Sequence, residues 1–124
     1  MAFNFEKLEV YKKAIDFADK IYKICRNFPS NETYGLAGQI KRASVSISSN
    51  IAEGSGRYNK KEFVQYLRIA RGSIYECIPL LEISYKQSFI NTTDYEKFLL
   101  ECNELAKMIN GLISSLLKPS SVNH

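Results

Sequence analysis

Histidine and tryptophan are almost missing from this chain. Its 124 residues include one histidine, His124, the last residue, and no tryptophan. Histidine is the commonest general base and metal ligand near neutral pH, and chain ends usually fray. We therefore expect no catalytic residue, no cofactor and no metal site, and we interpret the protein as a non-enzyme.

Cysteine and the turn-forming residues are also scarce. The three cysteines, Cys25, Cys77 and Cys102, are far apart, and no Cys-x-x-Cys pair occurs. This spacing argues against a zinc site, and we expect three buried, reduced thiols. Six glycines and three prolines are too few for a β-sandwich rich in tight turns.

Long apolar runs are absent as well. No stretch approaches the roughly 18 consecutive apolar residues that a membrane span needs, and the first residues lack the layout of a signal peptide. The composition, with 45% hydrophobic and 24% charged residues, is that of an ordinary globular protein. We expect a cytoplasmic protein with a single domain over residues 1–124 that does not associate with membranes.

Apolar residues recur at helical spacing throughout the chain. Steps of three and four residues predict amphipathic helices near residues 6–27, 33–54, 60–87 and 93–117, with a frayed tail over 119–124. The short connections favour an all-α fold, a single up-down-up-down antiparallel four-helix bundle. The four apolar seams run from Val10 to Phe28, Leu36 to Ile51, Phe63 to Leu81 and Phe98 to Leu116.

Local signals mark the helix ends. Asn59 with Glu62 predicts the cap of the third helix, and Thr93 with Glu96 has the spacing of a capping box for the fourth. Gly54-Ser55-Gly56 predicts a helix stop in which glycine adopts the left-handed conformation. Pro79 lies inside the third seam, which resumes at Leu81, so we expect a kink there rather than a break.

The second helix is rich in serine. Small polar residues allow a neighbouring helix to approach closely, but they are equally compatible with a solvated face. The serines are Ser44, Ser46, Ser48 and Ser49.

Positive charge is concentrated in the middle third of the chain. Between Gln39 and Ser73 two acids, Glu53 and Glu62, accompany seven basic residues, for a local net charge of +5 (7 − 2) within a total of +4. These seven are the candidate nucleic-acid-binding residues: Lys41, Arg42, Arg57, Lys60, Lys61, Arg68 and Arg71.

Four of these residues fall on one line of a helical wheel. At about 100° per residue, Arg57, Lys61, Arg68 and Arg71 form a stripe beside the third seam, with Tyr75 on the same line. A row of cations with an aromatic neighbour suits a phosphate backbone, although such rows are more often only solvated. The acids near it show no metal-ligand spacing, and Glu62 is better explained as a cap residue.

Several short motifs together resemble a known family. They include Gln39-Ile40-Lys41-Arg42-Ala43, Asn50-Ile51-Ala52-Glu53-Gly54, Gly56-Arg57, Glu62-Phe63, Tyr66-Leu67 and Ile69-Ala70-Arg71-Gly72-Ser73. This pattern, over about residues 5 to 117, is similar to that of the 23S rRNA-intervening sequence proteins of bacteria. Ser48 stands where the family often has proline, and Pro79 lies in a helix that is usually uninterrupted.

The resemblance implies a small all-α protein with no established enzymatic activity. The family is in turn similar to the accessory protein of diversity-generating retroelements, a basic pentamer that binds nucleic acid and a reverse transcriptase. The resemblance therefore implies a homo-oligomer, with a homopentamer as the best guess. Such an assembly would bury flanking apolar residues such as Ile15, Tyr22, Val45, Tyr66, Ile69 and Ile78.

The same pattern suggests a structural polar network. Asn50 lies near the core edge, where an unpaired polar group costs about 1 to 3 kcal/mol. Asn50, Glu53, Arg57 and Arg71 could form one hydrogen-bonded network that ties the second helix to the third.

Two functions remain open from the sequence. In the first, the basic zone binds RNA or DNA without strong sequence preference. In the second, the protein is a scaffold or accessory subunit whose positive face docks an acidic protein partner.

Overall fold

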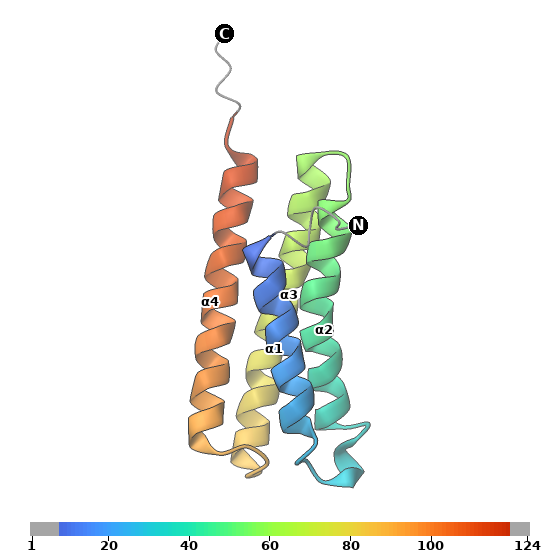
Figure 1. Ribbon diagram of the computed structural model, residues 1–124, viewed down its shortest axis with the longest axis vertical. Coiled ribbons are helices and arrows are strands. Elements are labelled where there is room, and N and C mark those ends of the chain that lie inside the picture. The colour runs from blue at the N-terminus through green and yellow to red at the C-terminus, as the bar shows by residue number, and fades with distance from the viewer. Residues whose placement is uncertain (1–7, 120–124) are drawn as a thin grey trace.

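The computed structural model describes residues 8–119, and it shows four helices arranged up-down-up-down (Figure 1). Helix α1 covers Glu9–Cys25, α2 Leu36–Ser55, α3 Lys60–Lys86 and α4 Thr92–Leu117, with a short 3-10 turn, η2, at Ser30–Glu32. The all-α antiparallel bundle is confirmed. Residues 1–7 and 120–124, which include part of the expected first helix and most of the expected tail, lie outside the described residues.

The core follows the predicted seams. Phe17, Ile47, Leu67, Ile74 and Ile109 are fully buried, one or more from each helix. The three cysteines are free and buried, as expected. Because the 3.6-residue period places every third or fourth side chain on one face, four such faces meet in a single hydrophobic interior.

Helices α2 and α3 pack closely because small residues lie between them. The Ser73 hydroxyl on α3 lies 2.8 Å from the Ser46 hydroxyl on α2. A Cβ built on Gly54 would lie 2.6 Å from the Tyr66 Cβ, so no larger residue fits without displacing α3. Of the two interpretations of the serine-rich helix, close approach holds for Ser46, which contacts Ser73 of α3, while Ser49 is exposed. Ser44 and Ser48 are buried and donate to carbonyls of their own helix.

The end of α2 corrects one expectation. The helix stops after Ser55, but its C-cap residue Gly56 has a φ of −85°, and none of the glycines in the described ranges has a positive φ. Gly54 is therefore explained by the approach of α3 rather than by a left-handed turn. The one non-glycine residue with positive φ in residues 8–119 is Ser88, after α3.

The start of α4 corrects another. Asn91, not Thr93, is the N-cap residue: its side-chain oxygen accepts a 2.8 Å hydrogen bond from the Asp94 amide. Thr93 is already the second residue of the helix. The predicted cap of α3 is confirmed, because the Asn59 side chain accepts a 2.9 Å hydrogen bond from the Glu62 amide.

Pro79 does not end α3. The helix runs from Lys60 to Lys86 with Pro79 inside it, so the expected absence of a break is confirmed, while the expected kink stays a prediction. Helix α2 likewise runs without interruption through Ser48.

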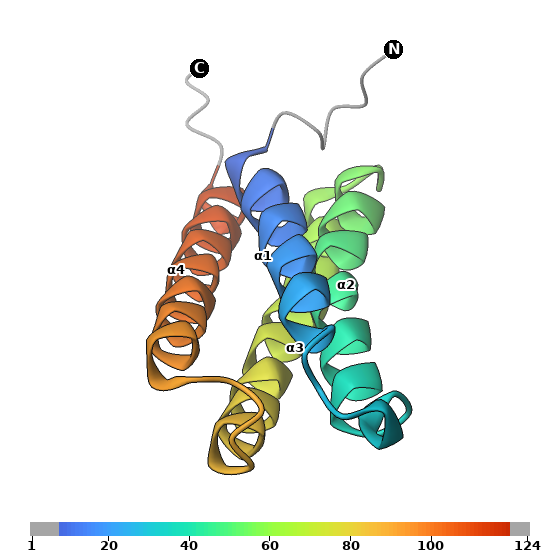
Figure 2. The ribbon, with the colours of Figure 1, turned by 60° about the horizontal axis from the view of Figure 1, so that its bottom comes forward.

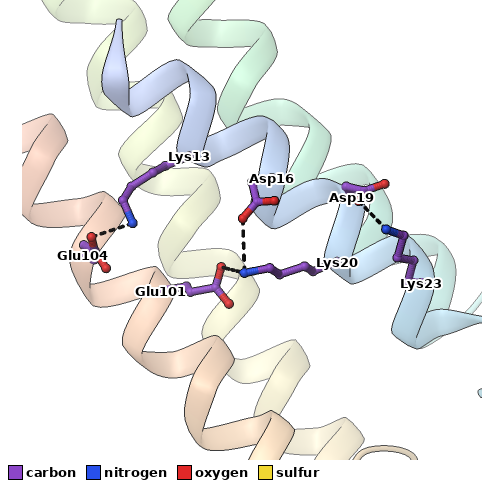
Figure 3. Close-up of polar contacts among 7 residues, drawn as sticks. All are labelled: Lys13, Asp16, Asp19, Lys20, Lys23, Glu101 and Glu104. Atoms are coloured by element: carbon purple, nitrogen blue, oxygen red, sulfur yellow. Dashed lines mark hydrogen bonds and ion pairs between the residues drawn. The ribbon is translucent and has the colours of Figure 1, made fainter.

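Helices α1 and α4 are held together along their outer surface by ion pairs (Figure 3). Lys13 lies 2.6 Å from Glu104, and Lys20 lies 3.2 Å from both Glu101 and Asp16. The two helices diverge toward the end of α1 (Figure 2). Grooves of about 440 and 310 Å³ lie between them, lined by Lys20, Lys97 and Glu101 among others.

Candidate nucleic-acid interface

The seven predicted basic residues are distributed over α2, α3 and the turn between them. Lys41 and Arg42 lie in the first half of α2, Arg57 lies in the α2–α3 turn, and the other four lie in the first half of α3. At 1.5 Å per residue, Lys41 is about 24 Å along the α2 axis from Arg57. The seven residues therefore do not form one compact patch.

Their side chains also face different neighbours. The Lys41 ammonium lies 5.1 Å from the centroid of the Tyr22 ring on α1. The Arg71 guanidinium donates a 2.8 Å hydrogen bond to the side-chain oxygen of Asn110 on α4. Lys41 and Arg71 thus face different helices, α1 and α4.

The predicted stripe is present on α3 but does not extend to Arg57. Lys61 and Arg68 line a groove of about 270 Å³ together with Leu117 of α4, and Arg71 continues toward α4. Arg57 instead turns toward α2 and Tyr66. The helical wheel misplaced Arg57 because this residue belongs to the turn, where a step of 100° per residue does not apply.

We call Arg57, Lys60, Lys61 and Arg68 the basic end. It lies where the α2–α3 turn and the last turn of α4 come together at one end of the bundle (Figure 1). All four residues are exposed. No acidic residue occurs in α4 after Glu104, so that helix contributes no carboxylate to this end.

The basic end differs from α1 in how its cations are neutralised. Every lysine of α1 is paired with a carboxylate: Lys12 with Glu9, Lys13 with Glu104, Lys20 with Asp16 and Glu101, and Lys23 with Asp19. Within residues 8–119, Lys60, Lys61 and Arg68 form no ion pair; Arg68 donates instead to the neutral side chain of Gln65, at 3.2 Å. Three of the four cations of the basic end therefore have no carboxylate partner in the described part of the chain, and the fourth, Arg57, is paired with Glu53.

The expected polar network is divided into three separate groups. Arg57 donates to the Glu53 carboxylate at 2.7 Å, as expected, and also to the Tyr66 hydroxyl at 2.6 Å. Asn50 donates to the Ser46 carbonyl at 2.8 Å, and Arg71 bonds to Asn110. The prediction of one network was wrong because Asn50 bonds to Ser46 on its own helix and Arg71 bonds to Asn110 on α4.

Tyr66, Ser73 and Asn110 complete these groups, and they were not selected from the sequence. Asn50 and Ser46 are four residues apart, a spacing that places them on one helix face. The partners of Arg57 and Arg71 are 9 and 39 residues away, and only the packing of the helices brings them close.

The pKa shifts of titratable groups away from the basic end have structural causes. Burial raises the pKa of the Cys25 thiol to about 11 and that of Cys102 to about 12, and it raises the pKa of Cys77 still further. The hydrogen bonds to Asp16 and then Glu101 raise the pKa of Lys20. Thiols of this kind are protonated near neutral pH and are poor nucleophiles.

Two further properties follow from the described part of the chain. Across residues 8–119, no three His, Cys, Asp or Glu side chains are grouped so that they could hold a metal ion. None of the helices in the same range is long and apolar enough to cross a membrane.

Fold and surface together define a small antiparallel helical-bundle protein with a basic end whose charge is only partly paired among residues 8–119. The sequence profile of the 23S rRNA-intervening sequence protein family matches residues 6–111. The chain belongs to this family.

A solved structure supports the same fold. It is a crystal structure of a protein with unknown function from the S23 ribosomal protein family of Bacteroides thetaiotaomicron VPI-5482, with a TM-score of 0.78. The two sequences are 24% identical, and the match covers 85% of this chain and 95% of that one. No curated protein matches the chain.

Proposed function

We propose that this protein is a non-enzymatic nucleic-acid-binding module that contacts phosphates through its basic end. The observation that carries the proposal is that Lys60, Lys61 and Arg68, grouped at one end of the bundle, have no carboxylate partner within residues 8–119, whereas the α1 lysines are all paired. Exposed cations without internal partners hold only counterions, and their release on binding phosphate favours association. Such binding depends little on sequence.

We also propose that the module acts as a homo-oligomer, with a homopentamer as the expected form. Four of the six flanking apolar residues, Ile15, Tyr22, Val45 and Ile69, are between 39% and 53% exposed. Tyr66 and Ile78 are instead partly buried within the bundle. A ring would repeat the basic end in every subunit, and a species of 14.2 kDa in light scattering at micromolar concentration would refute this assembly.

The test of binding is a charge reversal with a matched control. Lys61→Glu with Arg68→Glu should abolish nucleic-acid binding at moderate salt and flatten the dependence of log affinity on log salt. Lys97→Glu with Lys107→Glu makes the same change in net charge at exposed positions of α4 and should retain most of the affinity. Helix content and oligomer size should be unchanged in both variants.

The result also separates the basic end from a merely solvated surface. Equal binding by the Lys61/Arg68 variant and the parent would contradict the role of the basic end. A parent that binds no nucleic acid even at low salt would contradict the proposed function.

The alternative function is a scaffold or accessory subunit that docks an acidic protein. Ile69 and Tyr75, 53% and 51% exposed, lie on α3 near Arg68 and Arg71, and apolar side chains beside cations favour a protein partner. Purification from the native cell with and without nuclease treatment distinguishes the two. A partner protein that stays bound after nuclease treatment supports the scaffold, and one that is lost supports nucleic-acid binding.

A further inference from the structure

Tyr58 is the most exposed large hydrophobic residue of the described chain. It lies in the α2–α3 turn with a relative exposure of 103%, so its ring packs against none of the residues 8–119. Tyrosine rings usually bury most of their surface, because the apolar ring is costly to hydrate. The position of Tyr58 therefore has no explanation in the stability of the bundle.

The surroundings of Tyr58 are cationic. Arg57 precedes it directly, and Lys60 and Lys61 follow within three residues. Of the two nearest acids, Glu53 forms an ion pair with Arg57 at 2.7 Å, whereas Glu62 accepts from the neutral Asn59 side chain at 3.1 Å and keeps its charge. An exposed aromatic face is thus close in sequence to three cations, two of which, Lys60 and Lys61, have no carboxylate partner among residues 8–119.

Tyr34 provides an internal comparison. It lies between η2 and α2 and is 98% exposed, almost as much as Tyr58. No lysine or arginine occurs within six residues of it on either side. Exposure alone is common to both tyrosines, and only Tyr58 combines it with positive charge.

We propose that Tyr58 is a base-stacking platform for single-stranded nucleic acid, with Lys60 and Lys61 holding the flanking phosphates. Every base offers an aromatic face for stacking, which makes such contacts tolerant of sequence. In a duplex these faces are already covered by neighbouring base pairs, so Tyr58 discriminates single strands from duplexes while the cations attract both. This proposal rests on the proposed nucleic-acid binding and specifies the kind of nucleic acid.

The absence of tryptophan allows a direct spectroscopic test. Tyr58→Trp introduces the only tryptophan of the chain, and stacking of a base on that ring should quench its emission when single-stranded oligothymidylate is added. A duplex of the same length should leave the emission nearly unchanged. Tyr34→Trp is the matched control and should not respond to either ligand.

Affinity measurements provide the second readout. Tyr58→Ala should weaken binding of the oligothymidylate about 5- to 150-fold and leave duplex binding within about twofold of the parent. Tyr34→Ala should change neither. Since Tyr58 has no packing partner, the loss of its side chain should not alter helix content.

The outcomes distinguish this inference from the proposed function. If Tyr58→Ala binds the single strand as tightly as the parent, or Tyr58→Trp binds without quenching, Tyr58 does not stack and only phosphate binding remains. If the parent binds neither the single strand nor the duplex, the proposed function fails, and base stacking fails with it.

Discussion

The Arg57 guanidinium lies 4.8 Å from the centroid of the Tyr66 ring and donates a 2.6 Å hydrogen bond to the hydroxyl of the same residue. One arginine in the α2–α3 turn is thereby attached to the second turn of α3. The Glu53 carboxylate holds the same guanidinium from α2. The turn that carries the basic end is fixed on both sides by this single side chain.

Tyr66→Phe and Arg57→Ala should separate the two parts of that contact. Tyr66→Phe removes the hydrogen bond and keeps the ring, so we expect a loss of about 0.5 to 1.5 kcal/mol in the free energy of unfolding. Arg57→Ala also removes the cation–π contact and the ion pair, and should cost about 1 to 2 kcal/mol. Urea unfolding measures both values, and a larger loss for Tyr66→Phe than for Arg57→Ala would contradict this assignment.

Gly54→Ala should destabilise the bundle although alanine is the better helix former. The added methyl would lie 2.6 Å from the Tyr66 Cβ and 3.3 Å from the Phe63 carbonyl oxygen, so the helices must move apart. We expect a net loss of about 1 to 3 kcal/mol, typical of overpacking.

Gly72→Ala is the control for Gly54→Ala. Nothing lies within 4 Å of a Cβ built at Gly72, which is also inside a helix. The same substitution should there stabilise by about 0.5 to 1 kcal/mol. Thermal unfolding of both variants checks the sign, and equal shifts would show that the close approach of α2 and α3 is unimportant.

Asn91→Ala and Thr93→Ala should identify the cap of α4. The Asn91 side chain accepts the Asp94 amide, and its loss should cost about 1 kcal/mol. Thr93 is exposed inside the first turn, so Thr93→Ala should change the free energy of unfolding by less than about 0.5 kcal/mol. A larger loss of unfolding free energy for Thr93→Ala than for Asn91→Ala would instead support the capping box predicted from the sequence.

The buried thiols should make the stability of the protein fall at alkaline pH. Burial raises the pKa of Cys25 from 9.0 to about 11, so the thiol keeps its proton in the folded state where the unfolded chain loses it. The stabilisation is complete below about pH 9 and is lost as the pH rises through 11, at up to about 1.4 kcal/mol per pH unit for each thiol.

Cys25→Ala separates the contribution of this thiol to the pH dependence from that of tyrosine and lysine titration, because the variant retains all tyrosines and lysines. The slope of unfolding free energy against pH between 9 and 11 should be shallower in the variant than in the parent. Identical slopes would show that the Cys25 thiol does not contribute.

Much of the fold could be predicted because helical periodicity is a local property of the sequence. The seams through Phe17, Ile47 and Ile109 depend only on the spacing of apolar residues, and all three are buried. The site was less predictable because its partners come from other elements. Asn110 reaches Arg71 from α4, and no spacing within α3 indicates that contact.

The dependence on other elements also explains the two wrong predictions at helix ends. Asn91 and Thr93 are both good cap residues, and which of them caps α4 depends on where the chain leaves the connection from α3. Glycine is needed at position 54, but not for a left-handed turn: a larger residue there would collide with Tyr66 on another helix.

The grooves between α1 and α4 have a consequence for how the bundle opens. Apart from the buried Phe17–Phe98 contact, that boundary is held by ion pairs at the surface and widens toward the end of α1, whereas Gly54 and the Ser46–Ser73 contact bring α2 and α3 close together. Exposed ion pairs contribute little and are screened by salt. The first amide hydrogens to exchange with solvent should therefore be those of α1, and salt should accelerate this partial opening while α2 and α3 stay protected as a pair.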